Sequence, residues 1–239
     1  MKVWGVTHRG VVRQQNQDAF AQRFLEDGRV IALVCDGMGG ARAGNVASAM
    51  AVELFMEEFL ADHSGEREEE RMQRAASRAN HEIFQRSIQD SECTGMGTTI
   101  VAALAGKGEA VLLNEGDSRA YHVNQSGIVQ ITRDHSLVEE LVERGELTRE
   151  EARSYPRKNL ITRALGAEPL LRADCFRQPL AEGEFLLLCS DGLSNTLDEQ
   201  ELLYEVIHGG DAASCCQRLL EIALDRGATD NVTAVLIRC

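Results

Sequence analysis

The stretch VIALVCDGMGG, Val30 to Gly40, places a carboxylate directly after six apolar residues. The apolar run predicts a strand, and the acid that follows it would stand at the end of that strand. Glycines at positions 37, 39 and 40 then leave the backbone almost bare. The stretch FLLLCSDGL, Phe185 to Leu193, repeats the order of apolar run, cysteine and Asp-Gly. One such feature is typical of a turn, whereas two indicate carboxylates that meet at one place.

The composition is that of an ordinary globular protein, with 239 residues, 44% hydrophobic and 26% charged. This length suits one large domain or two small ones with a substantial core. No apolar run approaches the ~20 residues that a membrane-spanning helix needs, and the first ten residues contain no apolar signal core. We therefore expect a cytoplasmic protein that does not associate with membranes and whose seven cysteines are reduced thiols.

The formal net charge of −13 argues against non-specific binding to nucleic acid, which depends on basic residues that neutralise phosphates. Acidic chains are common, and solubility alone would explain the excess. A part of it could instead be carboxylates gathered to hold cations.

Short segments rich in valine, leucine and isoleucine are predicted to be strands because glycine, asparagine or aspartate bounds them. They lie near Val3–Thr7, Ala19–Phe24, Val30–Cys35, Thr98–Ala105, Glu109–Glu115, Ser118–Val123, Ile128–Gln130, Phe185–Cys189 and Thr233–Arg238. The middle segments follow one another through short turns, and strands joined in this way must be antiparallel.

Helical periodicity appears from Asn45 onward, from Glu66 to about Ser87, and around Cys215–Ala223. The charged stretch 133–169 lacks a strand pattern and predicts short helices at Ser136–Arg144 and Thr148–Ser154. We interpret it as an insertion that covers one face. The order of the elements favours a layered α+β domain with antiparallel sheets.

Five aspartates stand beside predicted strands with glycine or asparagine nearby: Asp18, Asp36, Asp117, Asp191 and Asp230. Any one of them alone is more typical of a turn residue. Strand ends in a sheet share an edge, so acids far apart in the sequence can converge there. Converging carboxylates repel one another, and they raise their own pKa values or lose stability unless cations lie between them.

Ligands that are all oxygen favour magnesium, manganese or calcium, and neither a zinc pattern nor the EF-hand spacing is present. Asp36 could bridge two cations, and Gly37 could present its backbone carbonyl as a further ligand. Gly39 and Gly40 would leave room for a substrate phosphate, although a simple turn into a helix explains them equally well. Arg13 could grip that phosphate with paired hydrogen bonds, although an isolated arginine is more often a surface residue.

Together these motifs resemble the bacterial form of the metal-dependent protein phosphatases, the type 2C serine/threonine phosphatases. The resemblance rests on eight motifs in the order of the family: THRGVVRQQNQD (Thr7–Asp18), DGMGG (Asp36–Gly40), MGTT (Met96–Thr99), GDSRAY (Gly116–Tyr121), ITRDHS (Ile131–Ser136), ITRALG (Ile161–Gly166), SDGL (Ser190–Leu193) and DN (Asp230–Asn231). They span nearly the whole chain. Each motif is weak alone, whereas the ordered set is highly specific.

The resemblance implies one catalytic domain over residues 1–239, with a flap subdomain at 133–169. Its fold would be a four-layer α/β/β/α sandwich, with two packed antiparallel sheets and a helix pair on each outer face. Two Mn²⁺ or Mg²⁺ ions would bind in the core site. Asp36, Asp191 and Asp230 would hold one of them, while Asp36, the carbonyl of Gly37 and Asp18 would hold the other. Asp117 with Asp191 resembles a third, weaker site.

The implied activity is hydrolysis of phosphoserine and phosphothreonine by a hydroxide that bridges the two cations, with Arg13 on the phosphate. The partners would be phosphorylated proteins that serine/threonine kinases produce, and the enzyme would be a monomer. Two departures from common family patterns are Met38, where many eukaryotic members have histidine, and Gln17, where many relatives have glutamate. The general acid for the leaving group is therefore unassigned.

Two alternatives stay open at this stage. A catalytically weak relative could bind phosphoproteins through its flap. A metal phosphohydrolase for small phosphate esters would use the same pocket motifs. An assay of metal-dependent hydrolysis of a small phosphate ester would distinguish the first alternative from an active phosphatase. A comparison of the turnover of phosphopeptides with that of nucleotides and sugar phosphates would distinguish the second.

Overall fold

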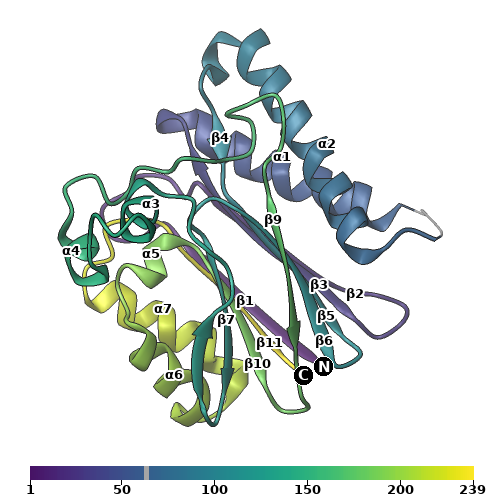
Figure 1. Cartoon of the computed structure of the whole chain (residues 1–239), viewed down its shortest axis with the longest axis vertical. Coiled ribbons are helices and arrows are strands. Elements are labelled where there is room, and N and C mark those ends of the chain that lie inside the picture. The colour runs from purple at the N-terminus through teal and green to yellow at the C-terminus, as the bar shows by residue number, and fades with distance from the viewer. Residues whose placement is uncertain (62–64) are drawn as a thin grey trace.

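The computed structural model describes residues 1–61 and 65–239, with the side chains of residues 40–42 and 153 left out. Two antiparallel sheets pack against each other, and helices cover both outer faces (Figure 1). The predicted four-layer α/β/β/α sandwich is confirmed. None of the described helices is both long enough and apolar enough to span a membrane.

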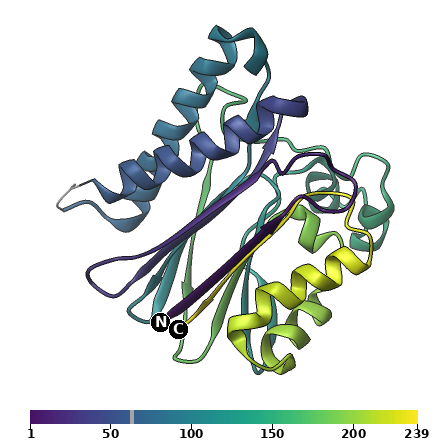
Figure 2. The ribbon, with the colours of Figure 1, turned by 180° about the vertical axis from the view of Figure 1, so that it is seen from behind.

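The first sheet has five strands in the order β1-β11-β10-β7-β8. Their bounds are Lys2–His8 for β1, Val232–Arg238 for β11, Phe185–Cys189 for β10, Arg119–Asn124 for β7 and Gly127–Gln130 for β8. The first and last strands of the chain pair along their whole length, from Lys2 opposite Arg238 to His8 opposite Val232. The two chain termini therefore lie side by side (Figure 2).

The second sheet has the order β2-β3-β5-β6-β9, with the short β4 paired to the end of β3. Their bounds are Asp18–Phe24 for β2, Val30–Met38 for β3, Ile100–Gly106 for β5, Glu109–Glu115 for β6, Asp174–Pro179 for β9 and Gly97–Thr98 for β4. The apolar run before Asp36 is thus the second strand of this sheet, and it is buried from Val30 to Cys35.

Four longer helices form the outer layers. On the second sheet these are α1 (Gly40–Leu60) and α2 (Glu68–Gln89), and on the first they are α6 (Glu199–His208) and α7 (Cys215–Asp225). Short α3 (Leu137–Glu143), α4 (Arg149–Ser154) and α5 (Asp191–Ser194) lie at one end of the sheets, and the 3₁₀ turns span Ser91–Cys93 and Ala212–Ser214 (Figure 1).

The core has three apolar layers because each sheet is buried on both faces. One layer packs α1 and α2 on the second sheet through residues such as Leu33 and Phe55. A second layer packs α6 and α7 on the first sheet. The third lies between the sheets, where Val34 and Leu112 meet Leu188 and Val235. Such burial of alternating strand faces stabilises the sandwich by roughly 25 cal/mol for each Å² of apolar surface removed from water.

Several details differ from the sequence-based expectation. The segment expected as one strand at Thr98–Ala105 is divided at Thr99 into β4 and β5. The strand that was expected to end at Cys35 continues through Asp36 to Met38, because Asp18 pairs with Asp36 and Thr98 pairs with Gly37. The edge strand β9 was missed, since its partly exposed residues show no apolar run. Helix α6 was also missed, although Asp198 and Glu201 form a capping box at its start that marks a helix N-terminus.

Candidate metal centre

The five predicted aspartates come together at one end of the two sheets. Asp18 begins β2 and faces Asp36 across the β2–β3 pair. Asp191 opens α5 directly after β10, while Asp230 lies just before β11, the neighbour of β10. Asp36 lies close enough to the other four for each negative charge to disfavour its ionisation. The predicted convergence of these acids therefore holds.

Burial and like charge act in the same direction on these carboxyls. Burial raises the pKa of Asp36 well above its usual range, and the charges of Asp18 and Asp191 raise it further. Burial likewise raises the pKa of Asp117, with the charge of Asp191 adding to it. The pKa of Asp191 is raised by burial and then by the charge of Asp230. The site thus holds more negative charge than its surroundings stabilise.

Asp18 has one oxygen held firmly and one left bare. Oδ2 accepts hydrogen bonds from Ser190 Oγ at 2.7 Å and from Thr233 Oγ1 at 2.6 Å. Burial raises the pKa of Asp18 to about 7, although these two hydroxyls oppose the shift. Oδ1 of Asp18 is buried, and no described residue donates a hydrogen bond to it. The sequence motif SDGL contains Ser190, but only the β10–β11 register reveals that its hydroxyl orients Asp18.

These features fit divalent cations. Oδ1 atoms of Asp117 and Asp191 are buried like that of Asp18, without a hydrogen-bond donor among the described residues. Unpaired carboxylate oxygens in a negative site are the donors that Mg²⁺ and Mn²⁺ prefer. Within residues 1–61 and 65–239, no group of three or more acidic, histidine or cysteine side chains has a preformed geometry for metal coordination. The fit therefore rests on donor chemistry and excess charge.

The backbone of Asp36 is fixed by two adjacent threonines of the MGTT motif. The carbonyl of Asp36 accepts hydrogen bonds from Thr98 Oγ1 and from Thr99 N, both at 2.9 Å. The amide of Asp36 donates to Thr99 Oγ1 at 2.9 Å, and this hydroxyl lies 2.7 Å from that of Ser118. All three hydroxyl residues are buried. The network links the backbone of Asp36 to the residue next to Asp117.

Two of the glycines after Asp36 are required because a Cβ atom at either position would collide with neighbouring backbone atoms. A Cβ atom on Gly37 would lie 2.0 Å from the carbonyl oxygen of Gly44 and 2.7 Å from that of Gln17. Gly39 caps α1 at φ +122°, and a Cβ atom there would lie 2.7 Å from the Cα of Met96. Gly40 is the first residue of α1. The turn role of Gly39 is thus confirmed, while phosphate binding at Gly39 and Gly40 stays a prediction.

Arg13 lies on the loop between β1 and β2 and faces the carboxylates. Its Nη2 donates a hydrogen bond to Asp230 Oδ2 at 2.7 Å. The side chain is 51% exposed, so a ligand can reach it from solvent. The bond to Asp230 raises the pKa of Arg13, and the charges of Asp36 and Asp191 contribute as well. Arg13 therefore lies beside the cluster and is not an isolated surface arginine.

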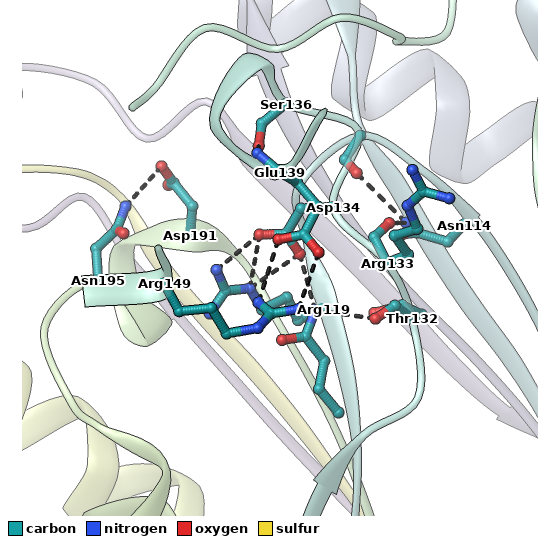
Figure 3. A network of polar contacts seen from close by, with 12 residues as sticks. Asn114, Arg119, Thr132, Arg133, Asp134, Ser136, Glu139, Arg149, Asp191 and Asn195 are labelled. Carbon is teal, nitrogen blue, oxygen red and sulfur yellow. Dashed lines mark hydrogen bonds and ion pairs between the residues drawn. The ribbon is translucent and has the colours of Figure 1, made fainter. Parts of the chain in front are cut away.

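The stretch 133–169 is tied to the sheet beside Asp117. Arg119 donates from Nε and Nη2 to Asp134, with distances of 2.6–3.0 Å (Figure 3). Within the stretch, Arg149 pairs with Glu139 of α3 at 3.0 Å (Figure 3). A bidentate arginine–carboxylate pair of low exposure is geometrically specific. It fixes where this stretch leaves β8, while a pair of backbone hydrogen bonds between Leu165 and Thr98 ties the far end of the stretch to β4.

His135 is engaged in structural contacts through both ring nitrogens. Gly116 N donates to Nδ1 at 3.1 Å, so the ring hydrogen of a neutral imidazole lies on Nε2 and points to Asp174 Oδ2, also at 3.1 Å. Burial lowers the pKa of His135 below its usual value. The backbone of His135 returns a hydrogen bond to the carbonyl of Gly116 at 2.9 Å. The residue holds the loop before Asp117.

The raised pKa values predict an unusual dependence of stability on pH in the metal-free protein. Asp18 has a folded-state pKa of about 7 against an ordinary value of 3.8, so the folded state binds more protons between these values. The free energy of unfolding should then fall as the pH rises from about 4 to about 7. We expect the melting temperature without metal to be about 5 °C or more lower at pH 8 than at pH 5.

Differential scanning calorimetry of the chelated protein measures this effect. Carboxyls with a lowered pKa, such as Glu201 with a pKa of about 2, lose their contribution to the free energy of unfolding only in more acidic solution. They therefore do not affect the change in melting temperature between pH 5 and pH 8. Manganese should restore most of the loss at pH 8. A melting temperature of the metal-free protein that stays level or rises from pH 5 to pH 8 would show that ionisation of the five aspartates does not destabilise the fold.

Comparison with known proteins places this arrangement among phosphatases. Residues 5–236 match the protein phosphatase 2C family. The serine/threonine phosphatase stp of Listeria monocytogenes serotype 4b is 38% identical over 234 residues, which cover 97% of this chain and 93% of that protein. The protein phosphatase PhpP of Streptococcus pneumoniae is 35% identical over 239 residues, 99% of this chain and 97% of that one.

Solved structures agree with this sequence similarity. The serine/threonine phosphatase Stp1 from Staphylococcus aureus superposes with a TM-score of 0.94 at 34% identity, covering 100% of this chain and 94% of that one. The catalytic domain of serine threonine protein phosphatase PstP, in complex with two manganese ions, gives a TM-score of 0.86 at 31% identity. That likeness covers 98% of this chain and 96% of the other.

Proposed function

This chain belongs to the protein phosphatase 2C family and is a serine/threonine phosphatase, and we propose that its five-carboxylate cluster is the active site. The observation that carries the proposal is the convergence of five aspartates beside an exposed arginine. Three of them, Asp18, Asp117 and Asp191, have a buried oxygen to which no described residue donates a hydrogen bond. The family is metal-dependent, and the manganese-bound relative supports a binuclear site in this chain.

Residues of this chain would divide between the cations as follows. Asp36, Asp191 and Asp230 would hold one ion, and Asp36, the Gly37 carbonyl and Asp18 the other. Asp117 with Asp191 would hold a third, weaker one. When bound, Mn²⁺ or Mg²⁺ supplies Lewis acidity that acidifies water near neutral pH and neutralises charge on the phosphoryl oxygens.

The side chains of this chain have distinct tasks in that scheme. Arg13 would bind a phosphate oxygen, with Gly39 and Gly40 leaving space beside it. Ser190 and Thr233 hold Asp18 through one oxygen, so the other oxygen keeps its direction toward a ligand. Met38 has no proton to give, and His135 is buried with both ring nitrogens occupied. No described side chain at the site is therefore assigned as the acid for the leaving group.

A phosphocysteine mechanism is not supported at this site. Cys189 is fully buried at the end of β10, and burial raises the pKa of its thiol to about 12. A thiol with that pKa stays protonated at neutral pH and is a poor nucleophile. Ser190 is likewise buried and already donates its hydrogen to Asp18. Direct attack by water accords better with these contacts.

Substrate class is the part of the proposal that needs a direct comparison. We expect phosphothreonine and phosphoserine peptides to be hydrolysed with a kcat/KM at least about tenfold higher than nucleotides or sugar phosphates, since a protein substrate can contact the stretch 133–169 as well as the metal site. The measurement is phosphate release at saturating manganese from a matched panel. Equal or higher kcat/KM on small metabolites would favour the small-ester alternative, and no turnover of any substrate would favour a phosphoprotein-binding sensor.

The physiological partners would be phosphorylated proteins that a serine/threonine kinase produces. We further propose that the enzyme works as a monomer in the cytoplasm. The flap role of residues 133–169 within a single catalytic domain is part of the same proposal. Its support is the tie between Asp134 and Arg119, two residues after Asp117.

A further inference from the structure

The loop between β1 and β2 is folded around one buried side chain from the other end of the chain. We call residues 9–17 the Arg13 loop. The amide of Asn231 donates from Nδ2 to the carbonyls of Arg9 and Gln15, each at 3.0 Å. Oδ1 of Asn231 accepts from the backbone N–H of Gln17 at 2.8 Å. One side chain thus binds both ends of the loop, which Figure 2 shows beside the segment leading into β11.

The chemistry of these three contacts calls for an amide. Two carbonyls need donors and one N–H needs an acceptor, and a primary amide of this size supplies all of them at once. Asn231 is only 3% exposed, so water cannot easily replace the three bonds. Aspartate would keep the acceptor but lose both donors, and alanine would lose all three.

Two backbone contacts press the same loop against the strand end. Val11 N donates to the carbonyl of Ala228 at 3.0 Å. Gly10 has φ +74°, and a Cβ atom there would lie 2.1 Å from the carbonyl oxygen of Asp230. The loop therefore approaches the Asp230–Asn231 dipeptide as closely as a backbone without a side chain allows.

The dipeptide also contacts the tip of the loop. Asp230 Oδ2 accepts from Arg13 at 2.7 Å, while Asp230 Oδ1 accepts from the backbone N–H of Asn231 at 2.9 Å. Asp230 is exposed enough to exchange Arg13 for another partner, whereas Asn231 is not. Asn231 would keep the loop in place when Arg13 turns from Asp230 to a ligand.

We propose that Asn231 is a positioning residue that acts through Arg13 by holding the Arg13 loop at the metal site. The inference rests on the proposed function, in which Arg13 binds the substrate phosphate. Since Asn231 lies inside the loop's contacts and touches no substrate, its effect on catalysis should pass entirely through Arg13. This distinguishes it from a residue that merely contributes to stability.

A double-mutant cycle tests the pathway. Arg13→Ala is expected to raise KM for p-nitrophenyl phosphate roughly 30-fold with kcat lowered less than about threefold, as for loss of one charge-assisted hydrogen bond made in both ground and transition states. Asn231→Ala should raise KM about tenfold with the same small change in kcat. In the Arg13→Ala background, Asn231→Ala should then change KM less than about twofold.

Asn80→Ala is the matched control for the loss of a buried amide. Asn80 is also buried, accepts from Gly166 N at 2.8 Å and donates to the carbonyl of Glu168 at 3.1 Å, away from Arg13. Its effect on KM should multiply with that of Arg13→Ala. If the KM effect of Asn231→Ala also multiplies with that of Arg13→Ala, the proposal is overturned. A loss of kcat in Asn231→Ala that exceeds its change in KM would overturn the proposal as well.

Two further measurements distinguish the positioning role of Asn231 from the metal-binding role of Asp230. Manganese affinity should change less than about twofold in Asn231→Ala, and a clear loss there would mean that the residue acts through Asp230 instead. Amide hydrogen exchange of the metal-free protein should be faster at Val11 and Gln17 in Asn231→Ala than in wild type. Unchanged protection at both amides would contradict the positioning role.

The exchange measurement needs no activity, so it separates failure of this inference from failure of the proposed function. A wild-type protein that hydrolyses no phosphate ester would overturn the proposed function while the exchange result still reports whether Asn231 holds the loop. If Asn231→Ala does not fold, Asn231→Leu, which keeps the approximate size of the side chain, removes the same three hydrogen bonds and adds no charge, enters the same cycle with the same expected outcomes.

Discussion

Exhaustive removal of divalent cations is expected to abolish phosphate release from phosphothreonine peptides, and added manganese is expected to restore it. Neither serine nor cysteine at the site is placed as a nucleophile, because Ser190 donates to Asp18 and the Cys189 thiol is buried with a pKa of about 12. Without cations, the acidic cluster would also repel the dianionic phosphate. The loss should reach the limit of detection, at least about 10³-fold, since metal ions supply several kcal/mol to the transition state.

The check is turnover after chelation and gel filtration, followed by a titration with manganese and magnesium. Circular dichroism at each step verifies that the chelated protein stays folded, which the neutralising protonation of Asp18, with its pKa of about 7, should assist near pH 6. Calcium serves as a comparison because it accepts the same oxygen ligands with looser geometry. Full turnover after complete chelation would be incompatible with the metal mechanism.

Asp36→Asn is expected to lower kcat by at least about 10³-fold while it stabilises the metal-free fold. Asp36 is the carboxylate that the other four acids most clearly oppose, so its amide removes one charge from a site already too negative. The same change removes the ligand that both cations would share, and a neutral amide oxygen binds a hard dication far less well. A higher melting temperature with nearly no turnover is the expected pair of results.

Asp27→Asn is a matched control at a strand turn outside the cluster. Hydrogen bonds from Lys107 and Arg29 lower the pKa of Asp27 to about 2, so its charge is stabilised where that of Asp36 is opposed. The control should leave turnover unchanged and lower the melting temperature slightly. If Asp36→Asn also lowers the melting temperature of the metal-free protein, Asp36 has a structural role that this account lacks.

The strand pattern was sufficient to predict where most of the carboxylates lie. Apolar runs to Cys35 and Cys189 mark β3 and β10, which lie in different sheets. The acids that follow them meet because the two packed sheets place the ends of these strands on the same side of the molecule. The four layers and the two ion sites came from the resemblance of eight ordered motifs and not from periodicity. The edge strand β9 was not predicted from the sequence because the partly exposed Arg177 and Gln178 interrupt its apolar pattern.

The residues that orient the cluster could not be found from local sequence. Ser190 and Thr233 read as a turn residue and a strand residue, and their hydroxyls meet Asp18 only because β10 and β11 pair in one register. Asn231 similarly looks like a turn residue after Asp230, although it binds a loop more than 200 positions away in the chain. Hydrogen bonds of this kind depend on tertiary contacts that a single sequence does not display.

The measurement that tests the central claim most directly is the binding of manganese to wild type and to Asp36→Asn by isothermal titration calorimetry at pH 7.5. The claim is that carboxylates buried together at the sheet ends hold the cations on which hydrolysis depends. Wild type should bind two manganese ions tightly with release of protons from the cluster, and Asp36→Asn should lose at least one of them. Equal binding of manganese by both proteins, or no binding by wild type, would contradict the account.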